Sequence, residues 1–91
     1  MIDVATFGKP YWEDGEIRTF DVLKDDDEYV WHRDRTDREI EILEGDGWQF
    51  QLDGCLPWLL EKGMVFDITK LELHRLIKGI NTLRIRIVKR G

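Results

Sequence analysis

Two histidines and one aspartate are the residues whose types could hold a metal ion. The chain contains two histidines, His32 and His74, and Asp34 follows the first by two positions. In an extended strand, residues two apart project to the same face, so His32 and Asp34 would point together. Two imidazoles and one carboxylate form the facial triad of non-haem iron sites, and the same ligand types bind Mn, Ni or Zn. A core or hydrogen-bonding role for each histidine stays open.

Other side chains that could do chemistry are weaker candidates. Cys55 is the one cysteine of the chain, so no intrachain disulfide can form. It follows the turn pair Asp53-Gly54 and has no base beside it in the sequence, which is typical of an inert loop thiol. The acidic run at residues 25–28 could attract a hard cation, but it lacks the spacing of a calcium-binding loop. We interpret it as a solvated loop.

Short strands separated by turn residues must position these side chains. Turns are indicated by Gly45-Asp46-Gly47 and by Asp53-Gly54. Alternation of apolar and polar residues predicts strands at 17–23, 29–34, 38–44, 48–52, 64–68 and 83–87. Trp48 and Phe50 lie on the apolar face of one of them and are expected in the core. Many short strands at this spacing are typical of an all-β sandwich or barrel.

Residues 70–78 disagree with the all-β pattern. Leu73, Leu76, Ile77 and Ile80 have the spacing of one helix face. Residues 69–72 also match a capping box, which commonly starts a helix. The local pattern alone therefore favours a helix at 70–78.

The spacing around His32 follows a recognisable motif. That motif runs G-x5-H-x-H, then three or four residues, then E-x6-G. His32 takes its first histidine and Gly45 its closing glycine, with the spacing intact. Asp34 stands at the second histidine, and Arg38 stands at the glutamate.

A second motif, G-x5-P-x-G-x2-H-x3-N, fits the spacing around His74. Gly63 takes its opening glycine and His74 its histidine. The proline, glycine and asparagine are replaced, in that order, by Thr69, Leu71 and Lys78. With these two motifs, residues 26–78 resemble the cupin superfamily.

The resemblance implies a fold and a metal site. The fold would be a small double-stranded β-helix, a jelly-roll barrel of two antiparallel sheets, forming a single domain over residues 1–91. Residues 69–78 would then be extended chain and turn instead of helix. His74 would come from another strand to meet His32 and Asp34, and the three would hold one divalent transition metal, which could be Fe, Mn, Ni or Zn.

Arg38 stands where cupins have a carboxylate ligand, and a guanidinium group carries only hydrogen-bond donors. If Arg38 faces the pocket, two arrangements are open. It pairs with Asp34 at a hydrogen-bond distance of about 2.7–3.2 Å and fills the pocket without a metal. Alternatively it binds an anionic substrate such as a carboxylate or phosphate beside the metal.

Composition and charge exclude some classes of partner. The net charge of −5 disfavours binding to nucleic acid, and the basic cluster at residues 84–90 is interpreted as the solvated face of a strand. No apolar run has the length of a membrane span. A lone cysteine fits a reducing compartment, so a cytoplasmic location is expected.

Two functional hypotheses follow. In the first, the protein is a metal-dependent oxygenase or isomerase acting on a small polar or anionic molecule, with Arg38 binding the substrate. In the second, it is a metal-free ligand-binding or dimeric interaction module. Small cupins commonly pair, and four tryptophans and exposed strand edges would need cover. A homodimer is therefore expected under either hypothesis.

Overall fold

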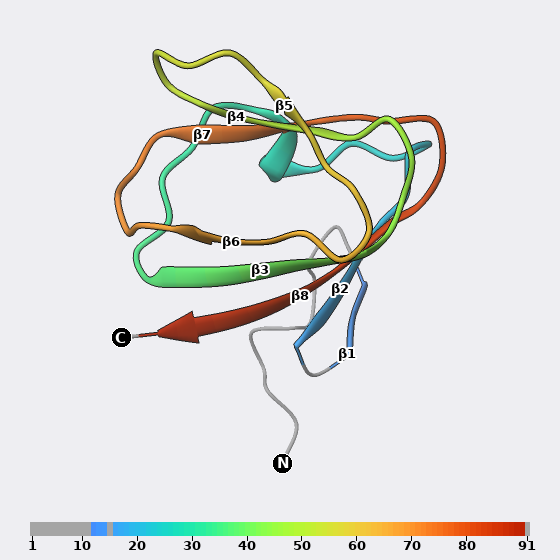
Figure 1. The fold of residues 1–91 in the computed structure, drawn as a ribbon, viewed down its shortest axis with the longest axis horizontal. Helices are drawn as coiled ribbons and strands as arrows, with labels where there is room; N and C mark the ends of the chain where they lie inside the picture. The colour runs from blue at the N-terminus through green and yellow to red at the C-terminus, as the bar shows by residue number, and fades with distance from the viewer. Residues whose placement is uncertain (1–11, 15, 91) are drawn as a thin grey trace.

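The structure is a computed structural model that describes residues 12–14 and 16–90. Within these residues the chain forms two sheets, with strand orders β1-β2-β8-β3-β6 and β5-β4-β7. Figure 1 shows β4, β5 and β7 above β3, β6 and β8. The elements are β1 (Trp12–Asp14), β2 (Ile17–Phe20), the 3₁₀ turn η2 (Asp27–Tyr29), β3 (Asp37–Glu44), β4 (Gln49–Leu52), β5 (Trp58–Leu59), β6 (Val65–Ile68), β7 (His74–Ile77) and β8 (Leu83–Arg90).

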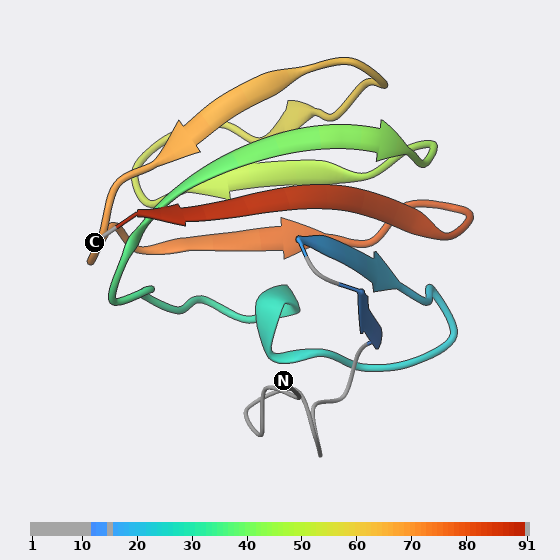
Figure 2. The same cartoon turned by 90° about the horizontal axis from the view of Figure 1, so that it is seen from below.

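The pairing of the strands confirms the prediction of an all-β chain with two antiparallel sheets. Each neighbouring pair in both sheets is antiparallel. In Figure 2 the N-terminal strands β1 and β2 lie at one margin, in agreement with their place at the end of the five-stranded order. Within the described part of the chain neither sheet closes on itself. A jelly-roll barrel therefore remains a proposal.

Alternating side chains on the long strands build the core. On β8, Leu83, Ile85 and Ile87 are buried, while Arg84 and Arg86 between them face the other way. Trp48 and Phe50 are also buried, as the sequence predicted. The buried apolar side chains form one cluster with members from both sheets: Phe20, Ile40, Ile42, Trp48, Phe50, Leu60, Ile68, Leu76, Leu83, Ile85 and Ile87.

The basic residues of β8 face a row of acidic residues on β3. These two strands are direct neighbours, and their register places Glu41 opposite Arg86. Three ion pairs connect the strands on this face: Arg84–Glu44, Arg86–Glu41 and Arg90–Glu39. Because the positive charges are offset locally, the interpretation of this cluster as a solvated strand face agrees with the structure.

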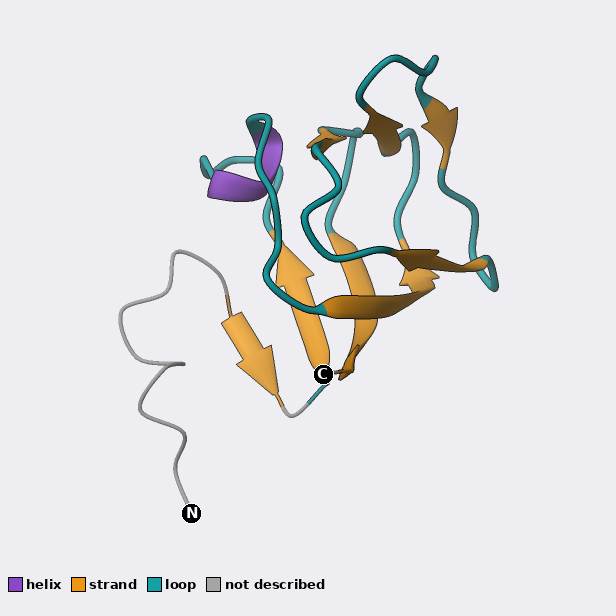
Figure 3. Ribbon diagram, turned by 90° about the vertical axis from the view of Figure 1, so that its left-hand side faces the viewer, coloured by secondary structure: helices purple, strands orange, loops and turns teal. Residues whose placement is uncertain are grey.

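The predicted strand at residues 29–34 is wrong. The side chain of Asp26 accepts a hydrogen bond of 2.8 Å from the backbone N–H of Glu28, and this cap starts η2 instead. Figure 3 shows η2 in purple, beside the strands. After the turn, only His32 makes a β-bridge, and its partner is His74. The cap at Asp26 therefore determines the local structure, although the apolar alternation of this segment favours a strand.

Residues 69–78 are extended chain and turn, as the resemblance predicted and against the local helical pattern. Leu71 has a φ of +64° and donates its N–H to the carbonyl of Asp34, which is incompatible with a continuing helix. β7 begins at His74 and pairs with β4, so that Leu76 lies opposite Phe50. Tertiary pairing outweighs the local propensity here.

The helical content is small: within the described ranges, no helix combines the length and the apolar character needed to cross a bilayer.

Candidate metal centre

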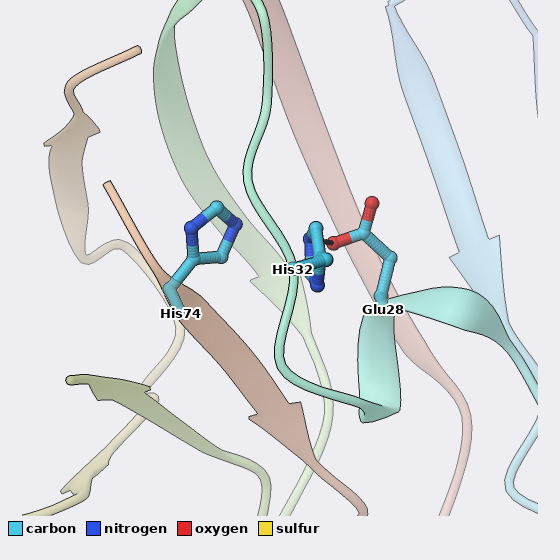
Figure 4. A group of neighbouring side chains, drawn as sticks. All are labelled: Glu28, His32 and His74. Atoms are coloured by element: carbon cyan, nitrogen blue, oxygen red, sulfur yellow. Dashed lines mark ion pairs between the residues drawn. The ribbon is translucent and has the colours of Figure 1, made fainter. Parts of the chain in front are cut away.

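The two histidines meet because their backbones form a bridge between two distant segments. The N–H of each residue donates to the carbonyl of the other at 3.0 Å. One histidine lies on the segment between η2 and β3, and the other opens β7. Their ring centroids are 4.3 Å apart. Figure 4 shows His32 and His74 side by side, with Glu28 approaching from the turn.

Each imidazole ring is oriented by a backbone carbonyl two residues earlier in the chain. Nδ1 of His32 lies 2.8 Å from the carbonyl oxygen of Val30, and Nδ1 of His74 lies 2.7 Å from that of Glu72. A carbonyl only accepts, so each Nδ1 carries the proton. In a neutral ring this leaves the lone pair on Nε2, and a second partner of this kind is usual for histidines that bind metals.

Two carboxylates lie against the Nε2 atoms. Oε2 of Glu28 is 2.7 Å from Nε2 of His32. Oδ2 of Asp34 is 3.1 Å from Nε2 of His74, and its Oδ1 is 3.7 Å from Nε2 of His32. Glu28, His32 and His74 each offer one ligand atom, and these three atoms all lie within 4.8 Å of one another.

The structure therefore brings the three residues that the sequence singled out close together, and it places a fourth, Glu28, with both histidines in the group whose ligand atoms could share one ion. His32, Asp34 and His74 converge, although the chain around His32 is not a full strand. Glu28 was missed because it was assigned to a solvated acidic loop. Asp26 is a favoured N-cap residue and so signals a turn, but η2 ends at Tyr29, and no helical spacing relates Glu28 to His32.

Two arginines flank the carboxylates. Nη1 of Arg18, on β2, lies 3.2 Å from Oε1 of Glu28, and Arg18 is only 2% exposed. Arg38, at the start of β3, faces the same cluster, as expected. Its Nη2 is 3.6 Å from Oδ1 of Asp34, and its Nη1 is 4.0 Å from Oε1 of Glu28. Arg38 thus forms ion pairs, but its distance to Asp34 exceeds the hydrogen-bond distance expected for a metal-free pocket.

These charges shift the protonation of the site. Burial lowers the pKa of His32, but the adjacent Glu28 carboxylate outweighs burial and raises the pKa to about 9. Burial works against ionisation of Glu28, yet His32 brings its pKa below the usual value. For Asp34 burial is likewise outweighed, by His74 and Arg38, and the pKa is lowered. Both carboxylates are charged at neutral pH, and in the metal-free protein His32 holds a second ring proton.

Several polar atoms of the cluster are buried without a partner in hydrogen-bond geometry. Within the described residues these include Nε2 of both histidines and Oδ2 of Asp34. The contacts of the two Nε2 atoms with the carboxylates are short, but they do not have the geometry of hydrogen bonds. A buried polar atom without a hydrogen bond is costly, and a bound metal ion or water would supply the missing partner.

A small cavity adjoins the cluster. Its volume is about 40 Å³, and apolar side chains such as Phe50 and Phe66 form much of its wall. The polar part of the wall is made by Arg18, Glu28, Asp34, Arg38 and His74. An apolar pocket with a few convergent polar groups is the usual form of a small-molecule site.

Comparison of the chain with protein-family models, with curated proteins and with solved structures found no match.

Proposed function

We propose that this protein is a small cupin-like, metal-dependent enzyme, an oxygenase or isomerase that acts on a small anionic molecule. His32, Asp34 and His74 would hold one divalent transition metal, Fe, Mn, Ni or Zn. Glu28 would supply the further carboxylate that the resemblance expects at the position of Arg38. The observation that carries this proposal is the convergence of two Nε2 atoms, each with Nδ1 fixed by a backbone carbonyl.

The donor set suits such an ion. Two imidazole nitrogens and carboxylate oxygens are ligands for Fe, Mn, Ni and Zn. Oδ2 of Asp34 and both Nε2 atoms are buried without hydrogen-bond partners, so each has a lone pair that a bound cation could use. A bound ion of this kind would supply Lewis acidity or oxygen activation. Arg38 would orient the anionic group of the substrate, and the apolar wall would exclude water.

Elemental analysis of the purified protein tests the proposal. Wild type should carry close to one metal ion per chain, and His74→Ala should lose it. Because His74 is buried, circular dichroism must show that the variant is folded, and His32→Gln at the less buried position gives a second test. Wild type without metal, even after incubation with each of the four ions, would contradict the proposal.

The ion pairs of the cluster favour a second candidate, a metal-free ligand-binding module. Arg18 and His32 both contact Glu28, and Arg38 lies near Asp34, so charge is already balanced in part without a metal. Under this alternative, Arg38→Glu should create metal affinity by replacing a cation with a ligand. Wild type would then remain metal-free while the variant binds one ion.

We also propose that the protein is a homodimer. β5 and β6 are edge strands of the two sheets. Leu59 on β5 is 46% exposed, and Val65 on β6 is 56% exposed. Unpaired edges with apolar side chains are surfaces that proteins normally cover, and a second copy of the chain would do so.

A further inference from the structure

We propose that the cavity beside the metal centre binds a short-chain monocarboxylate, with the carboxylate on Arg38 and the hydrocarbon part against the apolar wall. This inference rests on the proposed function, because it requires the ion to be bound. It narrows the substrate from any small anion to one chemical class.

Charge counting is the first argument. With a divalent ion in place and both histidines neutral as ligands, the ion and Arg38 face two carboxylates, Glu28 and Asp34. Even without Arg18, that gives three positive charges and two negative ones. Uncompensated charge in a partly buried site is unfavourable, so the site should attract an anionic ligand.

Arg38 has donors available for that anion. Its ion-pair distances to Asp34 and Glu28, 3.6 and 4.0 Å, are longer than hydrogen bonds. Its Nε is buried and, among the residues that the structure describes, has no hydrogen-bond partner. When Glu28 and Asp34 turn their oxygens to a metal ion, the guanidinium retains a planar fork of donors. A carboxylate matches this fork with two parallel hydrogen bonds.

The size and lining of the cavity select among anions. A volume of about 40 Å³ corresponds to roughly three water molecules, which is too little for a sugar phosphate or nucleotide. Phe50, Phe66 and Ile68 line it and offer no hydrogen bonds to the oxygens of a phosphate group. A carboxylate with a short alkyl chain satisfies both the cationic and the apolar part of the wall.

Isothermal titration calorimetry on the zinc-loaded protein tests the inference. The probes are acetate, propionate, butyrate and octanoate, with propionamide as the neutral analogue and inorganic phosphate as the competing anion. Affinity should rise from acetate to propionate and fall for butyrate and octanoate, which exceed the cavity. Propionamide and phosphate should bind at least about 10-fold more weakly than propionate, because a charged hydrogen bond or apolar contact is lost.

Two arginine variants separate a local effect from a general loss of charge. Arg38→Gln should weaken propionate binding by about 10-fold or more. Arg86→Gln removes the same charge from the outer face of β8, where Arg86 pairs with Glu41, and should leave the affinity unchanged. Equal effects of the two variants would overturn the inference.

The zinc content of each sample, measured by elemental analysis, distinguishes the two levels of the proposal. Stoichiometric zinc without propionate binding, or with phosphate bound most tightly, overturns the carboxylate inference and leaves the metal site intact. Wild type that binds no zinc contradicts the proposed function, and the charge excess behind the carboxylate inference falls with it.

Discussion

The candidate site depends at the residue level on contacts between the histidine rings and their own backbone. In each case Nδ1 contacts the carbonyl two residues earlier, so the ring cannot turn its Nε2 away without losing a hydrogen bond. This arrangement orients both rings before any ligand arrives. Such preorganisation reduces the entropy lost on binding and favours a defined site.

Stability of the metal-free protein should fall in mildly alkaline solution. The pKa of His32 is raised from 6.5 to about 9 in the folded protein, by Glu28 acting against burial. The charged pair therefore stabilises the fold fully below pH 6.5, and this contribution is lost as the pH rises through about 9. Urea denaturation in the presence of a chelator should show the decline, and His32→Gln should remove it. An equally steep decline in the variant would refute this assignment.

Glu28 is expected to contribute to metal affinity. Glu28→Gln keeps the size of the side chain but replaces an anionic oxygen with a weaker ligand, so affinity for zinc should fall by about 10-fold or more. Asp27→Asn is the matched control, since it removes one charge from an exposed neighbour on the same turn. Calorimetric zinc titration of the two variants measures the difference. Equal losses of zinc affinity in the two variants would mean that Glu28 acts only through its contribution to the net charge of this region.

The residues of the site differ in how far their positions could be predicted from the sequence. His32, Asp34 and His74 were found from residue type and motif spacing alone. Glu28 and Arg18 were not, because their positions depend on the η2 turn and on the pairing of β2 with β8. Neither relation leaves a motif in the sequence.

At the level of secondary-structure elements, the turns determine where the strands that carry site residues begin. Residues 70–78 have a helical apolar pattern, and only the motif resemblance predicted the strand found there. The reverse holds for residues 29–34, where alternation predicted a strand and a side-chain cap produced a turn. Long strands such as β3 and β8 were predicted well, since their alternation extends over many residues and meets no competing cap.

The turn before β8 should be intolerant of a side chain at Gly79. A Cβ there would lie 2.2 Å from the carbonyl oxygen of Asp46 and 2.6 Å from the backbone nitrogen of Trp48. Backbone atoms cannot move aside cheaply, so Gly79→Ala should destabilise the fold by about 3 kcal/mol or more. Gly54→Ala is the control, because nothing lies within 4 Å and only its φ of +78° costs energy, about 1 kcal/mol. Urea denaturation measures the free energy of unfolding of both variants. Equal losses for Gly79→Ala and Gly54→Ala would contradict the packing argument.

At the level of the whole molecule, the two open sheets leave edges that a second copy could cover. Val65→Lys on β6 should convert the proposed dimer into a monomer of 10.9 kDa, because a charged side chain on an edge opposes strand pairing. Leu23→Lys introduces the same side chain at an exposed residue outside the strands and should leave the dimer intact. Light scattering gives the masses. Wild type of monomer mass would refute the dimer itself.

The central claim is that both histidines bind one ion between the two sheets. A crystal structure of the zinc-loaded protein, with anomalous data at the zinc edge, tests it most directly. We predict one peak about 2.0–2.1 Å from Nε2 of His32 and from Nε2 of His74, with a carboxylate oxygen of Glu28 or Asp34 in the same shell. A structure without a peak at this position, with Glu28 still paired to His32, would contradict the claim.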